Sequence, residues 1–329
     1  MKILFQIRRW VFFYLIILCA KSNAQDAQLS QYYSSFTYLN PALAGVIDNT
    51  KLGVQYRSQW NNVESPYTST LVYAGHYLER SKLAFSFTYL GNEEGVSSFQ
   101  QDFLMFGSSY TFNLNDKVRI VPALQVGYNM EQLNSESFVF GDQLTSGGVT
   151  QQTQEDFSGT YSVNYLDFNS GILIVGDKAF IGFSASHLTE PNNSVFGTDD
   201  QLSRKYNLHT GYKLIYNEAK ERSWIITGLY KSQGKFDQLD LGTYIDAKVM
   251  AIGLWYRGLP FIKDFGGITN NESIVGMAGI KIKSLQISYS YDYVLSNLSS
   301  NAHEIALNYE FRINKKQVEP KRGLPIPMF

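Results

Sequence analysis

The chain has 329 residues, a net charge of −1 and 15% aromatic residues. A charge so close to zero gives neither a basic field for nucleic acid nor an acidic tail, so nucleic acid is not expected as a partner. The single cysteine, Cys19, lies in a predicted signal peptide, so the mature chain should contain no disulfide, no thiolate nucleophile and no cysteine metal ligand. The mean hydropathy of −0.19 excludes a bundle of membrane helices and allows a barrel, whose inner face is wet.

Residues 1–24 are predicted to be a secretory signal peptide. A basic region is followed by an apolar run over residues 10–20, and the small residues Ser22 and Ala24 precede an expected cut before Gln25. The alternative is a single membrane anchor, but a spanning helix needs about 20 apolar residues. This run is roughly half as long, which favours the signal peptide.

Residues 25–50 come next and show no regular period. This segment is broken at Asn40-Pro41 and at Gly45, and we interpret it as an extended periplasmic segment outside any barrel, available to partners.

Residues 51–312 are dominated by two-residue alternation of apolar and polar side chains. The last strand is the clearest, because Ile305, Leu307 and Tyr309 alternate with Ala306 and Asn308. Successive side chains on a strand point to opposite faces, so one face is predicted to meet an apolar medium and the other a polar one. Fourteen strands are predicted, over residues 51–60, 67–78, 82–91, 99–113, 117–132, 161–175, 178–188, 204–216, 222–233, 236–247, 248–257, 271–282, 284–295 and 302–312.

This pattern predicts an all-β fold, an antiparallel up-and-down transmembrane β-barrel of about 14 strands. A soluble β-sandwich also alternates, but its strands are usually about 5–6 residues long, whereas most of these approach the length of a tilted membrane strand. The three longest gaps, residues 133–160, 189–203 and 258–270, all follow odd-numbered strands. They are therefore predicted to lie on one face, outside the cell, with both termini in the periplasm.

Residues 313–329 form a basic tail that contains Pro320, Pro325 and Pro327. Proline cannot donate to a strand ladder, so this tail is not a further strand. It is predicted to sit in the periplasm, where a partner could bind it.

No catalytic constellation is recognisable, and the chain is predicted not to be an enzyme. Its four histidines, at 76, 187, 209 and 303, have neither H-E-x-x-H spacing nor cysteine companions, so no metal or other cofactor is expected. His303 and Glu304 are adjacent, but neighbours on a strand point to opposite faces and cannot act together as an acid–base pair. There is no G-x-S-x-G motif and no phosphate-binding glycine loop.

Two arginines are predicted inside strands, Arg57 and Arg257. Facing lipid they would cost about 2–4 kcal/mol at the membrane midplane, so alternation with Tyr56 and Tyr256 is expected to turn them into the lumen. Two interpretations remain open. Each arginine pairs with a lumen carboxylate such as Asp240, Asp246 or Glu310, or it holds a plug or a partner segment.

Several short runs recur along the chain as a signature: Gln31-Tyr32, Tyr38-Leu39-Asn40-Pro41-Ala42-Leu43-Ala44-Gly45, Tyr56-Arg57-Ser58-Gln59-Trp60, Ser184-Ala185-Ser186-His187-Leu188, Leu254-Trp255-Tyr256-Arg257 and Ala302-His303-Glu304-Ile305-Ala306-Leu307. Together they resemble the PorP/SprF family of outer-membrane proteins associated with type IX secretion and gliding. The resemblance spans Gln31 to Phe311. It implies a non-enzymatic barrel in contact with outer-membrane lipids, whose partners are periplasmic ring proteins of type IX secretion or a secreted surface adhesin.

On this resemblance, nine residues are candidates for the family signature or for partner docking: Tyr38, Asn40, Pro41, Gly45, Arg57, Trp60, Arg257, His303 and Glu304. The main alternative function is a porin or a channel for small or hydrophobic ligands, since a barrel of this size can enclose a conduit. A third is an esterase-type barrel. Bilayer conductance would identify the pore, and a lipid-hydrolysis assay would identify the esterase.

Overall fold

The computed structural model describes residues 26–327 except 48–49, 62–65, 96–98, 136–137, 146–147, 150–152, 155–158, 218–221, 248, 260–263, 266–267, 270–271, 296–300 and 314–324. The predicted signal peptide, residues 1–24, lies outside the described residues.

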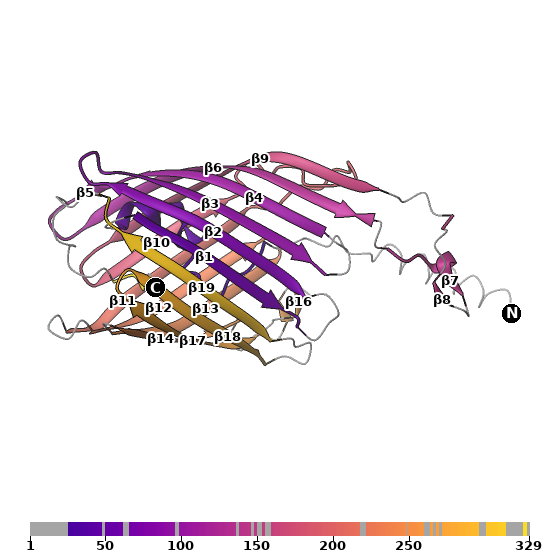
Figure 1. The fold of residues 1–329 in the computed structure, drawn as a ribbon. Coiled ribbons are helices and arrows are strands. Elements are labelled where there is room, and N and C mark those ends of the chain that lie inside the picture. Colours follow the sequence, from indigo (N-terminus) through magenta and orange to yellow (C-terminus); the bar gives the residue numbers. More distant parts are fainter. Residues whose placement is uncertain are drawn as a thin grey trace.

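Fourteen antiparallel strands close into one barrel (Figure 1). Each strand pairs with its neighbours along the chain, and the ring closes where the first strand pairs with the last, from Thr50 opposite Phe311 to Gln59 opposite Ala302. The predicted fold is therefore confirmed. The strands are β1 (Thr50–Gln59), β2 (Tyr67–Leu78), β3 (Leu83–Glu94), β4 (Phe99–Tyr110), β6 (Arg119–Asn134), β9 (Thr160–Val175), β10 (Ala179–Ser186), β11 (Lys205–Asn217), β12 (Arg222–Gln233), β13 (Phe236–Asp246), β14 (Met250–Arg257), β17 (Ser273–Ile282), β18 (Leu285–Val294) and β19 (Ala302–Phe311).

The remaining elements are short. They are the helix α2 (Phe36–Leu39), the 3-10 turns η1 (Pro41–Val46) and η3 (Gly141–Gln143), and the two-residue strands β5 (Phe112–Asn113), β7 (Leu144–Thr145), β8 (Gly148–Val149), β15 (Asp264–Phe265) and β16 (Ile268–Thr269). Among the described residues, no helix has the length and apolar character needed to cross a membrane.

Side chains of the wall alternate as the sequence predicts. On β19 the apolar Ile305, Leu307 and Tyr309 are exposed on the outer face, whereas Ala306 and Asn308 are 1% exposed and face the lumen. The exposed apolar residues on other strands repeat this arrangement around the barrel. An apolar outer band of this kind suits contact with lipid tails.

The two ends of the barrel differ in the length of their connections. Residues 135–159, 187–204 and 258–272 connect strands at one end, here called the long-loop mouth, on the right of Figure 1. At the other end, the short-turn rim, most connections have two to four residues; the exception is residues 111–118, where β5 extends the β4–β6 hairpin. The prediction that the three long loops share one face is thus confirmed.

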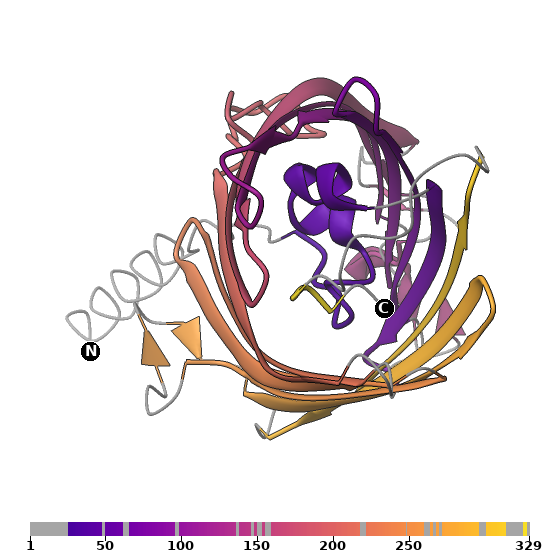
Figure 2. The same ribbon diagram turned by 90° about the vertical axis from the view of Figure 1, so that its left-hand side faces the viewer.

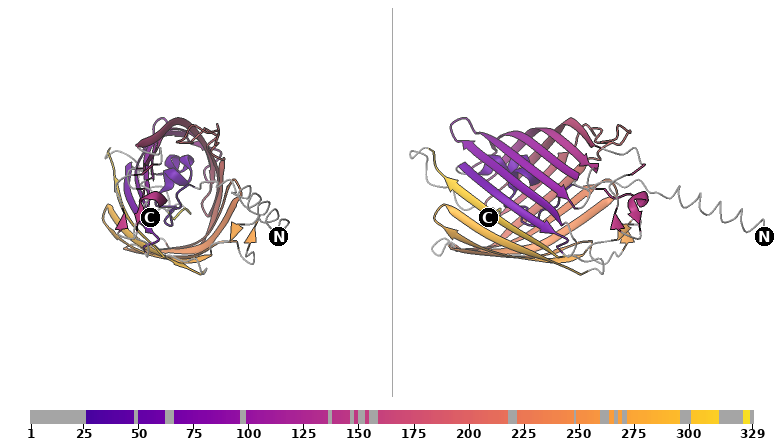
Figure 3. Two further views of the ribbon diagram at one scale, coloured as in Figure 1. Left: turned by 90° about the vertical axis from the view of Figure 1, so that its right-hand side faces the viewer. Right: turned by 45° about the vertical axis from the view of Figure 1, so that its right-hand side comes forward.

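The largest departure from the sequence analysis concerns residues 26–47, hereafter the plug. Instead of lying outside the barrel, they run through its lumen, so the prediction of a free N-terminal segment is wrong for these residues (Figure 2). The plug starts near the long-loop mouth, where Ser30 contacts Glu304, and ends near the short-turn rim, where Gly45 contacts Thr111. The view from the long-loop end in Figure 3 shows the same arrangement.

The physical reason lies in the size of the barrel. Fourteen strands enclose more space than their own inward side chains can fill, and many of these side chains are small, such as Ser86, Gly107 and Ala306. The plug fills the space with large rings: Tyr33 and Phe36 are at most 1% exposed, and Phe36 packs edge-on against Tyr73 of the wall with ring centroids 5.0 Å apart.

The tip of the C-terminal tail also enters the barrel. Pro325, Ile326 and Pro327 are buried, and Ile326 belongs to the same apolar cluster as the plug (Figure 2). The prediction of a wholly periplasmic tail is therefore wrong for these three residues. Residues 314–324 and 328–329 lie outside the described residues.

Candidate functional site

The plug is held to the wall by a group of buried charges, hereafter the anchor cluster: Arg57, Asp240, Arg257, Asp292 and Glu304. Strand register assembles it, because Arg57 lies opposite Glu304 and Asp240 opposite Arg257. Asp292 joins the two halves, accepting from Arg57 and from Arg257 at 2.9 Å each. The side chains of all five are at most 6% exposed.

Glu304 connects this cluster to the backbone of the plug. Its two carboxylate oxygens accept the N–H groups of Ser30 at 2.7 Å and of Gln31 at 2.6 Å, as well as Gln55 Nε2 at 2.5 Å and Arg57 Nη1 at 3.2 Å. Hydrogen bonds to an ionised acceptor are about twice as strong as neutral ones. Glu304 thus satisfies two backbone donors of an irregular segment that no strand could pair.

Ser30 is the residue of the plug that the cluster surrounds most closely. Its hydroxyl donates to Asp292 at 2.6 Å and accepts from Arg57 Nη1 at 2.5 Å and Arg257 Nη1 at 3.2 Å. Burying charges is favourable only when their hydrogen-bonding groups are satisfied. Because the plug contributes some of these partners, removing it would leave buried charges incompletely bonded.

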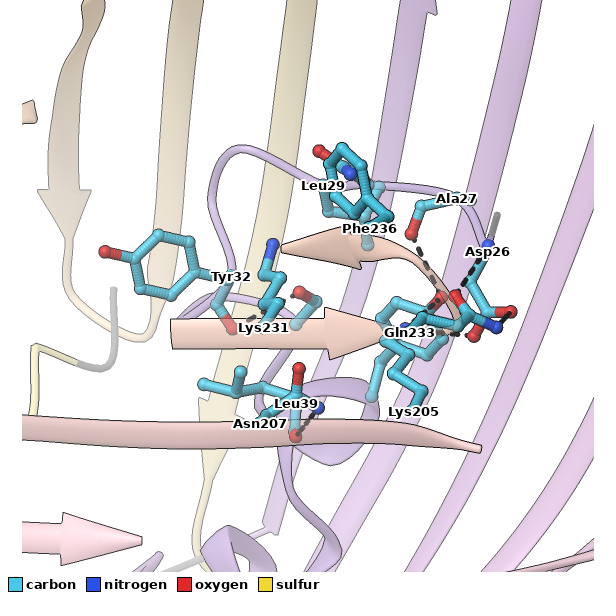
Figure 4. A pocket seen from close by; sticks show the side chains of 13 residues that line it. Asp26, Ala27, Leu29, Tyr32, Leu39, Lys205, Asn207, Lys231, Gln233 and Phe236 are labelled. Carbon is cyan, nitrogen blue, oxygen red and sulfur yellow. Dashed lines mark hydrogen bonds and ion pairs between the residues drawn. The ribbon is translucent and has the colours of Figure 1, made fainter. Parts of the chain in front are cut away.

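A second polar group, hereafter the clasp, holds the first described residue of the plug at the long-loop mouth (Figure 4). Asp26 pairs with Lys205 Nζ and with His187 Nε2, each at 3.0 Å, and accepts from Gln233 Nε2 at 2.9 Å. The other ring nitrogen of His187 bonds to Asp167 at 2.8 Å.

The two titrating groups of the clasp reinforce each other. Burial would raise the pKa of Asp26, but Lys205 and His187 hold it well below its usual range. Burial would likewise lower the pKa of His187, but Asp26 and Asp167 raise it to about 10. Both groups are therefore charged at neutral pH, and the clasp is an ion-pair network.

Two cavities flank the clasp, and both are lined by Asp26 and Tyr38. One has about 500 Å³ of empty space, part of it open to solvent, between the plug and the wall at Lys205 and Lys231. The other, of about 410 Å³, lies toward Phe103.

The signature run of the plug is explained by local fit. Asn40 caps η1, with its side chain accepting from Ala42 N at 2.9 Å, and its amide donates to the wall carbonyl of Phe183 at 3.1 Å. Pro41 occupies the first turn of η1, where its missing N–H costs nothing. At Gly45 a Cβ atom would lie 2.5 Å from Val121, so only glycine fits.

The nine predicted residues separate into three groups. Arg57, Arg257 and Glu304 meet in the anchor cluster, and Tyr38, Asn40, Pro41 and Gly45 belong to the plug, where Tyr38 accepts from Lys205 at 3.1 Å. The other two lie elsewhere. His303 is exposed on the outer face beside Tyr289, opposite in direction to Glu304, and Trp60 follows β1, half exposed and packed against Tyr67.

Both interpretations of the strand arginines hold in part. Arg257 pairs with Asp240 at 3.4 Å, as one of them proposed, and both arginines also bond to Ser30 of the plug, as the other proposed. Asp246 and Glu310 are not their salt-bridge partners among the described residues, since Arg57 pairs with Asp292 and Glu304, and Arg257 pairs with Asp240 and Asp292.

Sequence reasoning missed Ser30, Asp26 and the central role of Asp292. Two-residue alternation along β18 turns Asp292 to the inward face, but nothing local marks it as the bridge between two arginines. Within the described part of the chain, no group of three or more His, Cys, Asp or Glu side chains could hold a metal ion.

A closed barrel with an apolar outer band and a lumen occupied by its own N-terminal segment defines a plugged outer-membrane β-barrel. The family model described as "Type IX secretion system membrane protein PorP/SprF" matches residues 21–309, and the chain belongs to this family. No curated protein matches the chain.

Two solved structures show a similar fold. The P. putida toluene transporter TodX has a TM-score of 0.52 and 11% identity, over 84% of this chain and 93% of that one. The Ralstonia pickettii toluene transporter TbuX has a TM-score of 0.51 and 12% identity, over 85% and 94%. At this identity the likeness concerns the barrel alone.

Proposed function

We propose that this protein is a non-enzymatic docking barrel of the type IX system, which supports protein secretion or the attachment of secreted adhesins at the cell surface. Family membership gives the system. The observation that favours docking over passage is the plug. Its residues 29–37 and 39–47 are buried against the wall, and it is bonded to the wall near both ends of the lumen.

Surfaces at the two ends would serve partners on different sides. The long loops are suited to an extracellular adhesin, and the short-turn rim to periplasmic ring proteins. Two features support separate surfaces rather than a path between them. The anchor cluster uses the polar groups that would line a channel, and aromatic side chains of the plug pack against rings of the wall, as Phe36 does against Tyr73.

A porin is the second candidate, and conductance separates the two. The purified full-length protein is expected to show little conductance in a planar bilayer, whereas a variant lacking residues 26–47 should show a large stable open state. A large stable open state in the full-length protein would refute the docking proposal. Because the deletion could impair folding, Glu304→Gln provides a second variant, with brief openings expected from a barrel that still migrates as heat-modifiable.

The link to secretion needs its own experiment. Tagged full-length protein from detergent-solubilised outer membrane should co-purify with type IX components, and loss of the protein should reduce surface display of a type IX substrate. The matched comparison is the Glu304→Gln variant at equal membrane levels. Normal display without the protein, together with no enrichment of these components, would exclude the proposed role.

A further inference from the structure

The two ends of the barrel carry opposite charge. At the short-turn rim the described residues include eight exposed cations, Arg80, Lys82, Lys117, Lys178, Arg222, Lys281, Lys283 and Arg312, against three exposed carboxylates, Glu79, Asp116 and Asp177. At the long-loop mouth the balance reverses, since the described residues there include four exposed carboxylates, Glu93, Asp142, Asp199 and Asp200, against two exposed cations, Arg204 and Lys235.

These cations take no part in the salt bridges of the described residues, although Lys281 interacts electrostatically with Asp246. The salt bridges within 4.0 Å among the described residues involve Arg57, Arg257, His187, Arg204 and Lys205, and none of the eight. They are distributed over five of the six short connections and the end of β19, so they surround the rim. Most of their charge is therefore available to a partner outside the chain.

The sector formed by β17, β18 and β19 is the densest. Lys281, Lys283 and Arg312 lie there on adjacent strand ends, and the flanking Ile282 and Ile313 are 54% and 66% exposed. Exposed apolar side chains directly beside cations are typical of a membrane interface, where the apolar groups contact acyl chains and the cations contact headgroups. An acidic protein surface would complement the cations but not the isoleucines.

Backbone conformation gives an independent indication. Lys82 and Lys283 occupy turns with φ values of +57° and +55°, a left-handed conformation that glycine and asparagine adopt more easily than lysine. The turns therefore carry lysine where another residue would suit the backbone better. The presence of lysine at these two positions therefore favours a functional role for its positive charge.

We propose that the short-turn rim binds anionic phospholipid headgroups, most strongly at Lys281, Lys283 and Arg312, with acyl chains against Ile282 and Ile313. The lipid is an anionic phospholipid such as phosphatidylglycerol, whose phosphate accepts from the ammonium and guanidinium groups. This binding fixes the rim at the level of the headgroups in one leaflet. It requires a membrane barrel but no type IX partner.

The full-length protein in detergent micelles should be titrated with phosphatidylglycerol or with phosphatidylcholine, and bound lipid counted by native mass spectrometry. The triple variant Lys281→Gln, Lys283→Asn, Arg312→Gln is expected to lose about fivefold in phosphatidylglycerol affinity per cation. Asparagine suits the left-handed turn, so folding should be retained, as heat-modifiable migration will show.

Lys235→Gln is the matched control, since it removes an exposed cation from the two-residue β12–β13 turn at the opposite end. It should leave the affinity unchanged. Equal phosphatidylglycerol affinity in the wild type and the triple variant would overturn the proposal, as would equal binding of phosphatidylcholine by the wild type. Either result is obtained without type IX components, so it is distinct from failure of the docking proposal.

Discussion

Replacing Glu304 with glutamine should release the plug while leaving the barrel closed. The carboxylate accepts from two plug N–H groups and from Gln55 and Arg57, and it is 1% exposed. Glutamine has the same shape, but its amide NH2 group would replace one carboxylate oxygen. Two of the four N–H donors would then face another donor instead of an acceptor. Each buried donor left without an acceptor costs about 1–3 kcal/mol, and breaking a buried ion pair costs about 3–5 kcal/mol. We therefore expect the anchoring of the plug to weaken by about 3–5 kcal/mol.

Thiol labelling can measure this loss. Ser34, in the plug, is 2% exposed, and the mature chain is predicted to have no cysteine, so Ser34→Cys introduces a single reporter. When opening is fast compared with labelling, the rate follows the population of the open form. Since about 1.4 kcal/mol corresponds to tenfold, adding Glu304→Gln should accelerate labelling by roughly two to four orders of magnitude.

His303→Gln is the control for this measurement, because His303 is adjacent on β19 but points away from the lumen. Labelling in that variant should match the Ser34→Cys protein. If Glu304→Gln labels as slowly as the control, or if both accelerate equally, the anchor cluster does not hold the plug.

Three further predictions concern the clasp, the orientation and the outer face. The pKa of His187 is raised to about 10 from an unfolded value of about 6.5, so its charge stabilises the fold fully below pH 6.5 and this stabilisation is lost as the pH rises through 10. The difference in thermal stability between wild type and His187→Gln should therefore shrink across that range. A difference independent of pH would contradict the ion pair. A cysteine at Val149 should react with an impermeant reagent on intact cells, and one at Arg80 only after the outer membrane is breached; the reverse order would invert the orientation. Tyr309→Asp should reduce heat-modifiable assembly through charge on the lipid face, whereas Glu310→Gln should not, and equal effects would argue against the alternation.

The wall of the barrel was predictable because its signal is local. Each strand repeats the same alternation, and the surface it faces depends only on parity along the chain. The long loops were predictable for the same reason, since strand parity fixes the end at which each connection lies. Even the inward direction of Arg57 and Arg257 followed from their tyrosine neighbours.

The plug was not predictable in this way. A segment surrounded by wall on all sides has no polar face and therefore no period, so its sequence resembles that of an irregular exposed segment. Its hydrogen-bond partners are also remote, since Ser30 and Glu304 are 274 positions apart. That Arg57 meets Glu304 depends on the register between β1 and β19 across the closure, and residue pattern does not determine that register.

The polar inner face was consistent with a channel as well as with a plugged barrel, and the difference lies in where its hydrogen bonds go. In a channel, inward groups bond to water. Here Glu304 binds plug N–H groups, Asn308 accepts from Tyr73, whose ring reaches over Gly53 of the strand between them, and Ser184 donates to the plug carbonyl of Leu39 at 2.8 Å. An irregular backbone needs an acceptor or a donor for each of its own polar groups, and a wall of serine, asparagine and glutamate can supply them. A polar lumen together with an aperiodic, tyrosine-rich segment before the first strand therefore favours a barrel filled by its own chain, and this combination can be sought in sequences.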